Sequence, residues 1–309
     1  MITATQRKIL SVLDKKARIS FAKIGKLTSL PKSVVNYNVN SLQEKGVIKG
    51  FATLIDYSAL GFSEFRVYIN LFKNKSDTEF VDYLKQLKSV GVLVRCIGDY
   101  DLVVSFYVKD VVKFWNEWFF TLEQFNYLIR DYSFNFVVEK SLLPFFVDSE
   151  DRVASVVGRK TLQKYDGIDL TILSQLNLNC RKPIHEIANL IDKSSSVVIS
   201  RIKKLESLGV ITGYYTIFDF TKIGREFCRV QFRLEKLNDS FFSFLKLTPV
   251  VLSYGKILGA DLEVDFLVSN LNELLTTIEN MKINFPGLIR EYKYLRVIDT
   301  YKWNHLPEL

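Results

Sequence analysis

The sequence predicts an α+β fold built from two copies of one unit of about 150 residues. Three observations lead to this prediction. One short pattern occurs twice along the 309 residues. Within each copy, the spacing of apolar residues changes from a helical to a strand period. The later part of each copy has the order β-α-β-β-α-β. Each copy is therefore predicted to contain a helical domain followed by a sheet domain.

The repeat is visible in "PKSVVNYNVNSLQEKGVIKGF", residues 31–51, and "SSSVVISRIKKLESLGVITGY", residues 194–214. At an offset of 163, residues 9–61 align with residues 172–224 without a gap. Further on the offset is 160, where "IGDYDLVVSFYV" from Ile97 aligns with "ILGADLEVDFLV" from Ile257. The chain is therefore interpreted as a tandem duplication.

Helical spacing marks the first part of each copy. In copy 1, apolar residues at 9, 10 and 13, at 21, 24 and 27, and at 35, 39 and 42 predict three short helices. Thr3 and its equivalent Asp166 can cap the first helix, and Gly46 ends the third. Apolar residues alternate on either side of Gly50, which predicts a two-stranded wing within the copy. Three helices and a hairpin form a winged helix-turn-helix.

The second part of each copy alternates strands and helices. In copy 1 the predicted order is strand 64–72, helix 77–90, strands 91–97 and 101–108, helix 110–122 and strand 128–140. This order is typical of a ferredoxin-like domain. The predicted domains are a winged helix-turn-helix at 1–56, a ferredoxin-like domain at 61–142, a connector at 143–163, a second winged helix-turn-helix at 164–219 and a second ferredoxin-like domain at 224–309.

The net charge of +8 is concentrated in the two helical parts. Residues 1–50 hold 10 Lys and Arg against 2 Asp and Glu, and residues 159–213 hold 9 against 5. Residues 51–158 are acidic, with 11 against 15, and residues 214–309 are neutral, with 12 against 12. This distribution predicts a polyanionic partner for the helical parts; a solvated lysine-rich surface is the alternative.

Cysteine usage and hydropathy indicate the compartment. The three cysteines, Cys96, Cys180 and Cys228, form no close pair and no metal-ligand spacing. No apolar run approaches the roughly 18 residues that a membrane span needs. We therefore expect a cytoplasmic protein with no membrane contact, no bound metal and no cofactor.

The second copy resembles the Lrp/AsnC family of transcription regulators in "DGIDLTILSQL" from Asp166, in the pattern from Ser194 to Asp219, in Gly224 and in "GADLEVDFLV". The first copy matches in "RKILSVL", "LQEKGVIKGFATLID" and "GDYDLVVSFYV", but Asn38 stands where the second copy has Arg201. The resemblance implies ferredoxin-like domains of the RAM type, double-stranded DNA as partner, paired sheets and response to a small molecule. A tandem chain then implies an intramolecular pseudo-dimer, with further homo-oligomers as a possibility.

The third helix of each copy carries the candidate DNA-binding residues. In copy 1, the inward positions leave Lys32, Asn36 and Asn40 as an outward stripe flanked by Ser33 and Tyr37. Asn can read adenine and Lys can hold phosphate or guanine in a major groove.

The equivalent stripe of copy 2 is Ser195, Ile199 and Lys203, flanked by Ser196 and Ser200. It has fewer hydrogen-bond donors, so the first helix is predicted to read bases better, and the two faces have diverged. We also assign Arg18 and Arg201 to the DNA-binding set, Arg18 as a phosphate contact. For each stripe a solvated helix face is the alternative.

The resemblance places a candidate effector site at the strand-to-strand turns. Its residues are Gly98 and Asp101 in copy 1 and Gly259 and Asp261 in copy 2. Two carboxylates could hold an amino group, as in an amino-acid-like ligand. Tight turns need Gly and Asp in any case, so turn chemistry alone is the alternative.

Two other functions stay open. Siroheme decarboxylases share the two-part architecture, but catalysis on a tetrapyrrole would call for histidine in the sheet domains. Of the only two histidines, His185 lies in a predicted helix-turn-helix and His305 in the C-terminal tail, so neither falls in a sheet-domain pocket. We therefore expect no catalytic residues and no enzyme. A scaffold or co-regulator that does not read DNA is the second alternative.

One predicted helix is crowded with aromatic residues. Trp115, Trp118, Phe119 and Phe120 stand at spacings that one buried face cannot accommodate. Packing against the sheet is the favoured interpretation, and a contact between chains is the alternative.

Overall fold

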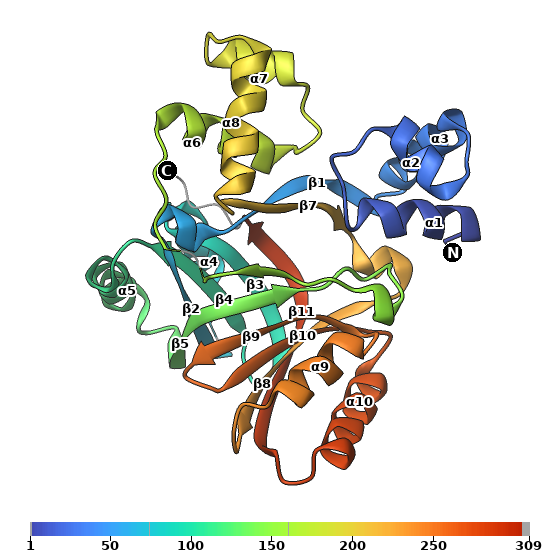
Figure 1. The fold of residues 1–309 in the computed structure, drawn as a ribbon. Helices are drawn as coiled ribbons and strands as arrows, with labels where there is room; N and C mark the ends of the chain where they lie inside the picture. The colour runs from blue at the N-terminus through green and yellow to red at the C-terminus, as the bar shows by residue number, and fades with distance from the viewer. Residues whose placement is uncertain (1, 74, 160, 305–309) are drawn as a thin grey trace.

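The computed structural model describes residues 2–73, 75–159 and 161–304, and it confirms the repeated α+β fold. Two helical domains, here called head 1 and head 2, lie on the same side of a large β-structure (Figure 1). Head 1 consists of α1 (Ala4–Leu13), α2 (Phe21–Thr28) and α3 (Lys32–Glu44). Head 2 consists of α6 (Gly167–Leu178), α7 (Ile184–Leu190) and α8 (Ser195–Ser207). No helix among the described residues is both long and apolar enough to cross a membrane.

The first helix of each head begins as predicted. The Thr3 side chain accepts from the backbone N–H of Gln6, and the Gln6 side chain accepts from the N–H of Thr3. Asp166 and Asp169 form the same reciprocal pair at the start of α6. Each pair satisfies backbone donors that a helix end would otherwise leave unpaired.

The predicted wing within each copy is wrong. Each copy supplies one long strand, β1 (Ile48–Ile55) or β7 (Ile211–Phe218), and these two strands pair antiparallel with each other. The register is centred on Ala52 and Tyr215. Alternation of apolar residues predicts a strand but does not say which strand it pairs with. The two heads are therefore joined by a shared two-stranded ribbon, seen between them in Figure 1.

The two ferredoxin-like sheets close into one barrel. Copy 1 gives β2 (Ser63–Leu71), β3 (Val90–Gly98), β4 (Leu102–Val108) and β5 (Ile129–Leu142), and copy 2 gives β8 (Glu226–Leu234), β9 (Val251–Leu258), β10 (Leu262–Val268) and β11 (Ile289–Trp303). The strand order is β2-β4-β3-β11-β8-β10-β9-β5, and β5 also pairs with β2. Because every strand is paired on both sides, this barrel has no free edge.

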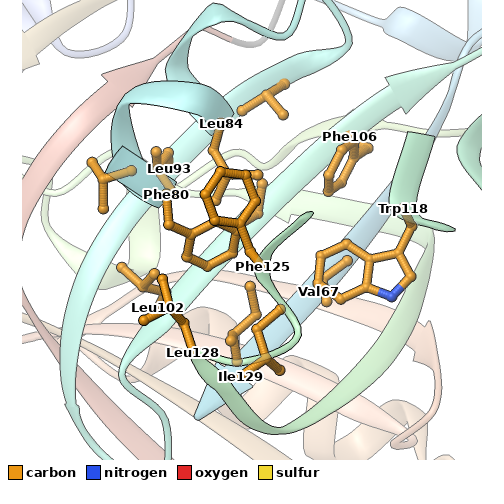
Figure 2. Close-up of a cluster of buried hydrophobic side chains, with 14 of the residues drawn as sticks. Val67, Phe80, Leu84, Leu93, Leu102, Phe106, Trp118, Phe125, Leu128 and Ile129 are labelled. Atoms are coloured by element: carbon orange, nitrogen blue, oxygen red, sulfur yellow. The ribbon is translucent and has the colours of Figure 1, made fainter. Parts of the chain in front are cut away.

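Four helices pack on the outside of the barrel: α4 (Thr78–Gln86), α5 (Val111–Phe125), α9 (Asp239–Leu247) and α10 (Leu271–Asn284). Under the helices of copy 1 lies an apolar core that contains Phe80, Phe106, Trp118 and Phe125 (Figure 2). An equivalent core in copy 2 contains Phe232, Phe241 and Phe266. The outer face of the barrel therefore supplies the hydrophobic cores, and the inner face is left for other side chains.

The connector predicted at 143–163 packs onto both copies. It contains a short 3-10 helix, η2 (Ser149–Asp151), and a strand, β6 (Ser155–Val157), that pairs with β5. Arg152 is buried and donates to the carbonyl oxygens of Pro144, Thr248 and Val251. Asp14 of head 1 accepts from the backbone N–H groups of residues 145 and 146. These bonds tie head 1 to the barrel.

Candidate nucleic-acid interface

Helix α3 presents the predicted stripe to solvent. Val35, Val39 and Leu42 are buried in the core of head 1. The opposite face carries only exposed side chains: Lys32, Ser33, Asn36, Tyr37 and Asn40. Tyr37 is 73% exposed, which is unusual for so large a ring. The face combines a cation, two amides and an aromatic ring, and these groups suit hydrogen bonding to base edges and phosphates.

Helix α8 presents a plainer face. Val198, Ile202 and Leu205 are buried, and the predicted outward residues are all exposed: Ser195, Ser196, Ile199, Ser200 and Lys203. Ile199 is 43% exposed. The serines offer short hydroxyl groups and Lys203 the only cation of this set, so the two heads differ in what they can recognise.

Arg201 does not belong to the outward face. Its guanidinium lies 2.5 Å from Asp166 and 3.1 Å from Asp169, the two residues that cap α6. Hydrogen bonds to these carboxylates raise the pKa of Arg201. The side chain thus holds α8 against α6, and the assignment of Arg201 to the DNA-binding set stays a prediction.

The substitution of Asn38 for this arginine in copy 1 has a matching explanation. At the positions of Asp166 and Asp169, copy 1 has Thr3 and Gln6, which are uncharged. Asn38 donates to the carbonyl oxygen of Val34 within its own helix. An ion cluster in head 2 is thus replaced by neutral groups in head 1. The presence of Asn38 where the family pattern has arginine is therefore explained by how the helices pack within the head.

Arg18 is also engaged within the molecule. It donates to the carbonyl oxygen of Cys180 in the other copy and lies over the Tyr214 ring. Its repeat equivalent, Arg181, donates to the carbonyl oxygens of Ala17, at 2.5 Å, and Ile19, at 2.9 Å. We call this reciprocal pair the arginine clasp. Both guanidinium groups are directed at the other head, and the phosphate contact predicted for Arg18 stays a prediction.

The ribbon beside the clasp follows the same symmetry. The hydroxyl of Thr53 donates to the carbonyl oxygen of Leu176, and its equivalent Thr216 donates to that of Leu13. Both threonines are buried. The first helix of each head is therefore hydrogen-bonded near its end to a strand of the other copy. These bonds hold the two heads in a fixed mutual arrangement.

The carboxylates predicted to bind an effector are already occupied. Asp101 accepts from the backbone N–H of Leu71 at 2.8 Å, and Asp261 accepts from that of Leu234 at 2.8 Å. These bonds close the ends of β2 and β8. The two aspartates therefore have a structural role, and the prediction that they hold an amino group stays a prediction.

The turn glycines are required by close approach between the copies. Gly98 has a φ of +122°, and a Cβ there would lie 2.6 Å from the carbonyl oxygen of Tyr294. Gly259 has a φ of +114°, and a Cβ there would lie 2.5 Å from that of Phe134. Positive φ and lack of space both exclude a side chain.

A cavity of about 220 Å³ opens beside the Gly259 turn. It is lined by residues from β5, β8 and β11 and by Tyr100, so both copies contribute. Two of its side chains, Asn135 and Gln231, are only 4% and 8% exposed. Their amide nitrogens have no hydrogen-bond partner among the described residues. Arg233, Lys293 and Glu291 also line this cavity, which therefore offers donors and a net positive charge to an acceptor group.

Comparisons with known proteins find relatives among DNA-binding regulators. Residues 2–49 and 165–212 each match a family model described as winged helix-turn-helix DNA-binding. The HTH-type transcriptional regulator FL11 of Pyrococcus horikoshii is 30% identical over 104 residues, which cover 34% of this chain and 69% of FL11. The regulator Ptr1 of Methanocaldococcus jannaschii is 32% identical over 111 residues, which cover 36% of this chain and 75% of Ptr1. The chain belongs to the Lrp/AsnC family of transcriptional regulators.

Two solved structures of one other protein match this chain over both of its copies. The siroheme decarboxylase NirDL aligns over 97% of this chain and 93% of its own, with a TM-score of 0.67 and 12% identity. Its complex with an iron-uroporphyrin III analogue aligns equally well, with 13% identity. At this identity the likeness shows a shared fold.

Asn135 and Gln231 were not predicted from the sequence as site residues. They alternate with apolar residues in "FNFVV" and "RVQFR", and such alternation usually means that the polar face meets solvent. In a closed barrel the same face points into the lumen. A polar residue within such a strand would indicate a site in the lumen only if it were already known that the strands close into a barrel.

Proposed function

We propose that this member of the Lrp/AsnC family is a sequence-specific DNA-binding regulator in which head 1 supplies most of the base reading. The observation that carries the proposal is the exposed stripe of Lys32, Asn36 and Asn40 on α3. Head 2 adds Lys203 and three serines, and its Arg201 is engaged within the head. One duplex would then meet two unlike faces, which favours a site with unlike halves.

The arrangement of the heads supports a single duplex as partner. Both heads lie on the side of the molecule away from the barrel helices α9 and α10, with the ribbon of β1 and β7 between them (Figure 1). The arginine clasp and the two threonine bonds fix this arrangement. A rigid pair of heads sets the spacing between half-sites before DNA is bound.

Substitution of the α3 stripe tests the proposal. A duplex selected from a random pool on the wild-type chain and an unrelated duplex of equal length serve as probes. For Lys32→Ala/Asn36→Ala/Asn40→Ala we expect the preference for the selected duplex to fall at least tenfold, since each lost base contact costs about 1–3 kcal/mol. Fluorescence anisotropy across a salt series measures this preference, and most of the salt slope should remain.

The matched control is Ser195→Ala/Ile199→Ala/Lys203→Ala in α8, which alters the equivalent positions of head 2. We expect a smaller loss of preference for this variant. Weak binding of the wild-type chain that does not vary with salt would instead favour the scaffold or co-regulator function. Equal losses in both variants would contradict the leading role of head 1.

We further propose that the cavity beside Gly259 binds a small carboxylate ligand, such as an amino acid. Its unpaired amides from Asn135 and Gln231 can donate to a carboxylate, and Arg233 supplies positive charge. Gly98, Asp101 and Asp261 then have structural roles, and Gly259 forms part of the wall. This assignment replaces the predicted effector residues with three others.

A thermal-shift panel of L-amino acids and their α-keto acids tests the cavity. A ligand at 100 times its Kd should stabilise the chain by about 2.7 kcal/mol. Asn135→Leu/Gln231→Leu should abolish this shift, and it should lower the Tm of the free chain because Gln231 also accepts from the Tyr100 hydroxyl at 3.2 Å. Arg233→Met should weaken the shift for carboxylates. A shift that survives the double substitution would place the ligand elsewhere.

We prefer the regulator function to a siroheme decarboxylase because of where the two histidines lie. His185 is exposed on α7 of head 2 and is therefore not on a barrel strand. His305 lies outside the described residues. The barrel strands themselves read without histidine. Turnover of siroheme by the purified chain would overturn this preference. A cytoplasmic location is part of the same proposal, and three buried free cysteines are consistent with it.

A further inference from the structure

The outward face of α5 is apolar and uncovered. Trp118 points into the core and is fully buried (Figure 2). Of the four aromatic residues, it is therefore the one that packs against the sheet as predicted. Val112, Trp115, Phe119 and Phe120 are 63%, 51%, 47% and 57% exposed. This set, here called the α5 face, lies on a helix that stands away from the rest of the molecule at one side of the barrel (Figure 1). So large an apolar face on one helix typically marks a contact surface.

The second copy provides an internal comparison. At an offset of 160, three of the four positions are polar in α10, where Asn272, Glu279 and Asn280 stand, and the position of Trp115 is taken by the smaller Leu275. Both helices cover equivalent sheets, and both bury their inward residues. The fold therefore does not require an apolar outer face at this place, and copy 1 carries it for a separate reason.

Charges at the two ends of the α5 face identify the partner. Lys113 lies near the start of α5 and Glu123 near its end, and both are exposed. Neither forms an ion pair with another described residue. When two such helices pack antiparallel, the start of one lies beside the end of the other. Lys113 of one chain then meets the Glu123 of a second copy, twice in the same contact.

We propose that two copies of this chain associate through antiparallel packing of their α5 faces. Trp115 and Phe119 would lie at the centre of the contact, and the Lys113–Glu123 pairs at its rim would set its direction. A twofold contact of this kind uses the same patch on both chains, so it closes at two chains. Since only copy 1 carries the face, the assembly has two pairs of heads and does not grow further.

Sedimentation of the full chain tests the proposal. We expect a concentration-dependent rise from 35.8 kDa to twice that mass. Trp115→Ala/Phe119→Ala should weaken the association at least a hundredfold, because residues of this kind dominate contact energies. The control Leu271→Ala/Ile283→Ala removes exposed apolar residues from α10 and should leave the mass distribution unchanged.

Charge exchange separates self-association from binding of a different protein. Lys113→Glu and Glu123→Lys should each weaken the association about tenfold, since each places like charges together. The double variant exchanges both charges and should restore it. A wild-type chain that stays at 35.8 kDa at 100 µM, or a double variant no better than the singles, would overturn the proposal. All variants should keep the DNA preference of head 1, so this test is independent of the proposed function.

Discussion

Replacement of Glu263 by leucine is expected to lower the free energy of unfolding by about 3–5 kcal/mol, because it leaves three cations in the barrel lumen with two carboxylates. Glu263 lies in the barrel lumen and is 3% exposed. It accepts from Arg66 and from the hydroxyl of Tyr68, and it lies 3.2 Å from Arg229. Leucine would remove the carboxylate and leave both guanidinium groups desolvated.

The size of this effect follows from the charge balance of the lumen. Arg66, Arg229 and Lys140 supply three positive charges, and they pair with the carboxylates of Glu64, Glu263 and Asp265. Copy 1 contributes two of the cations and copy 2 contributes two of the anions. Loss of one anion therefore cannot be compensated by a neighbour.

Urea denaturation at pH 7 measures the difference in unfolding free energy between wild type and variant. The control is Glu279→Leu on the outer face of α10, where the carboxylate pairs with exposed Lys282; we expect less than about 1 kcal/mol there. Glu263→Gln keeps an acceptor and should fall between the two. A loss for Glu263→Leu no larger than for Glu279→Leu would show that the lumen charges are solvated.

Acid should weaken the same network. Burial alone would raise the pKa of Asp265, but Arg229 and Lys140 outweigh this and hold its pKa well below the usual range. A carboxyl group with a depressed pKa contributes stability above its unfolded pKa of about 3.9 and loses it as pH falls below that value. The denaturation series repeated between pH 7 and pH 3 should show this decline.

Local patterns predicted the elements of this fold well. The helical spacing at 35, 39 and 42 and the order of strands from β2 to β5 both reflect short-range rules of burial. The wing was wrong because alternation around Gly50 cannot identify a partner strand 163 residues away. Closure of the barrel was hidden for the same reason, since the polar residues of β8 look like a solvated face.

Charged residues were the least predictable part of the site. Lys32 and Lys203 stayed on the outer faces as expected, whereas Arg18 and Arg201 are used inside the molecule. A sequence gives the charge of a helix but not the carboxylate or carbonyl group that meets it. For Arg201, the acidic residues Asp166 and Asp169 at the start of α6 were a signal, and their absence in copy 1 explains Asn38.

Removal of the arginine clasp is expected to have the second large effect. In Arg18→Met/Arg181→Met, the carbonyl oxygens of residues 17, 19 and 180 lose charged donors, each such bond being worth about 1.5–3 kcal/mol. Methionine keeps much of the apolar stem. We expect a fall of about 4–9 kcal/mol in the free energy of unfolding of the heads, measured by thermal or urea denaturation.

The same variant distinguishes a clasp from a phosphate contact. If the arginines hold the heads together, affinity for the selected duplex should fall at least tenfold, because the spacing of α3 and α8 is no longer fixed, while the slope of log K against log salt changes little. Two lost phosphate contacts would instead reduce that slope by about 1.8 and leave stability intact. Lys16→Met, at an exposed position beside the clasp, serves as the control that should leave stability unchanged. A reduced slope with unchanged stability would instead support Arg18 as a phosphate contact.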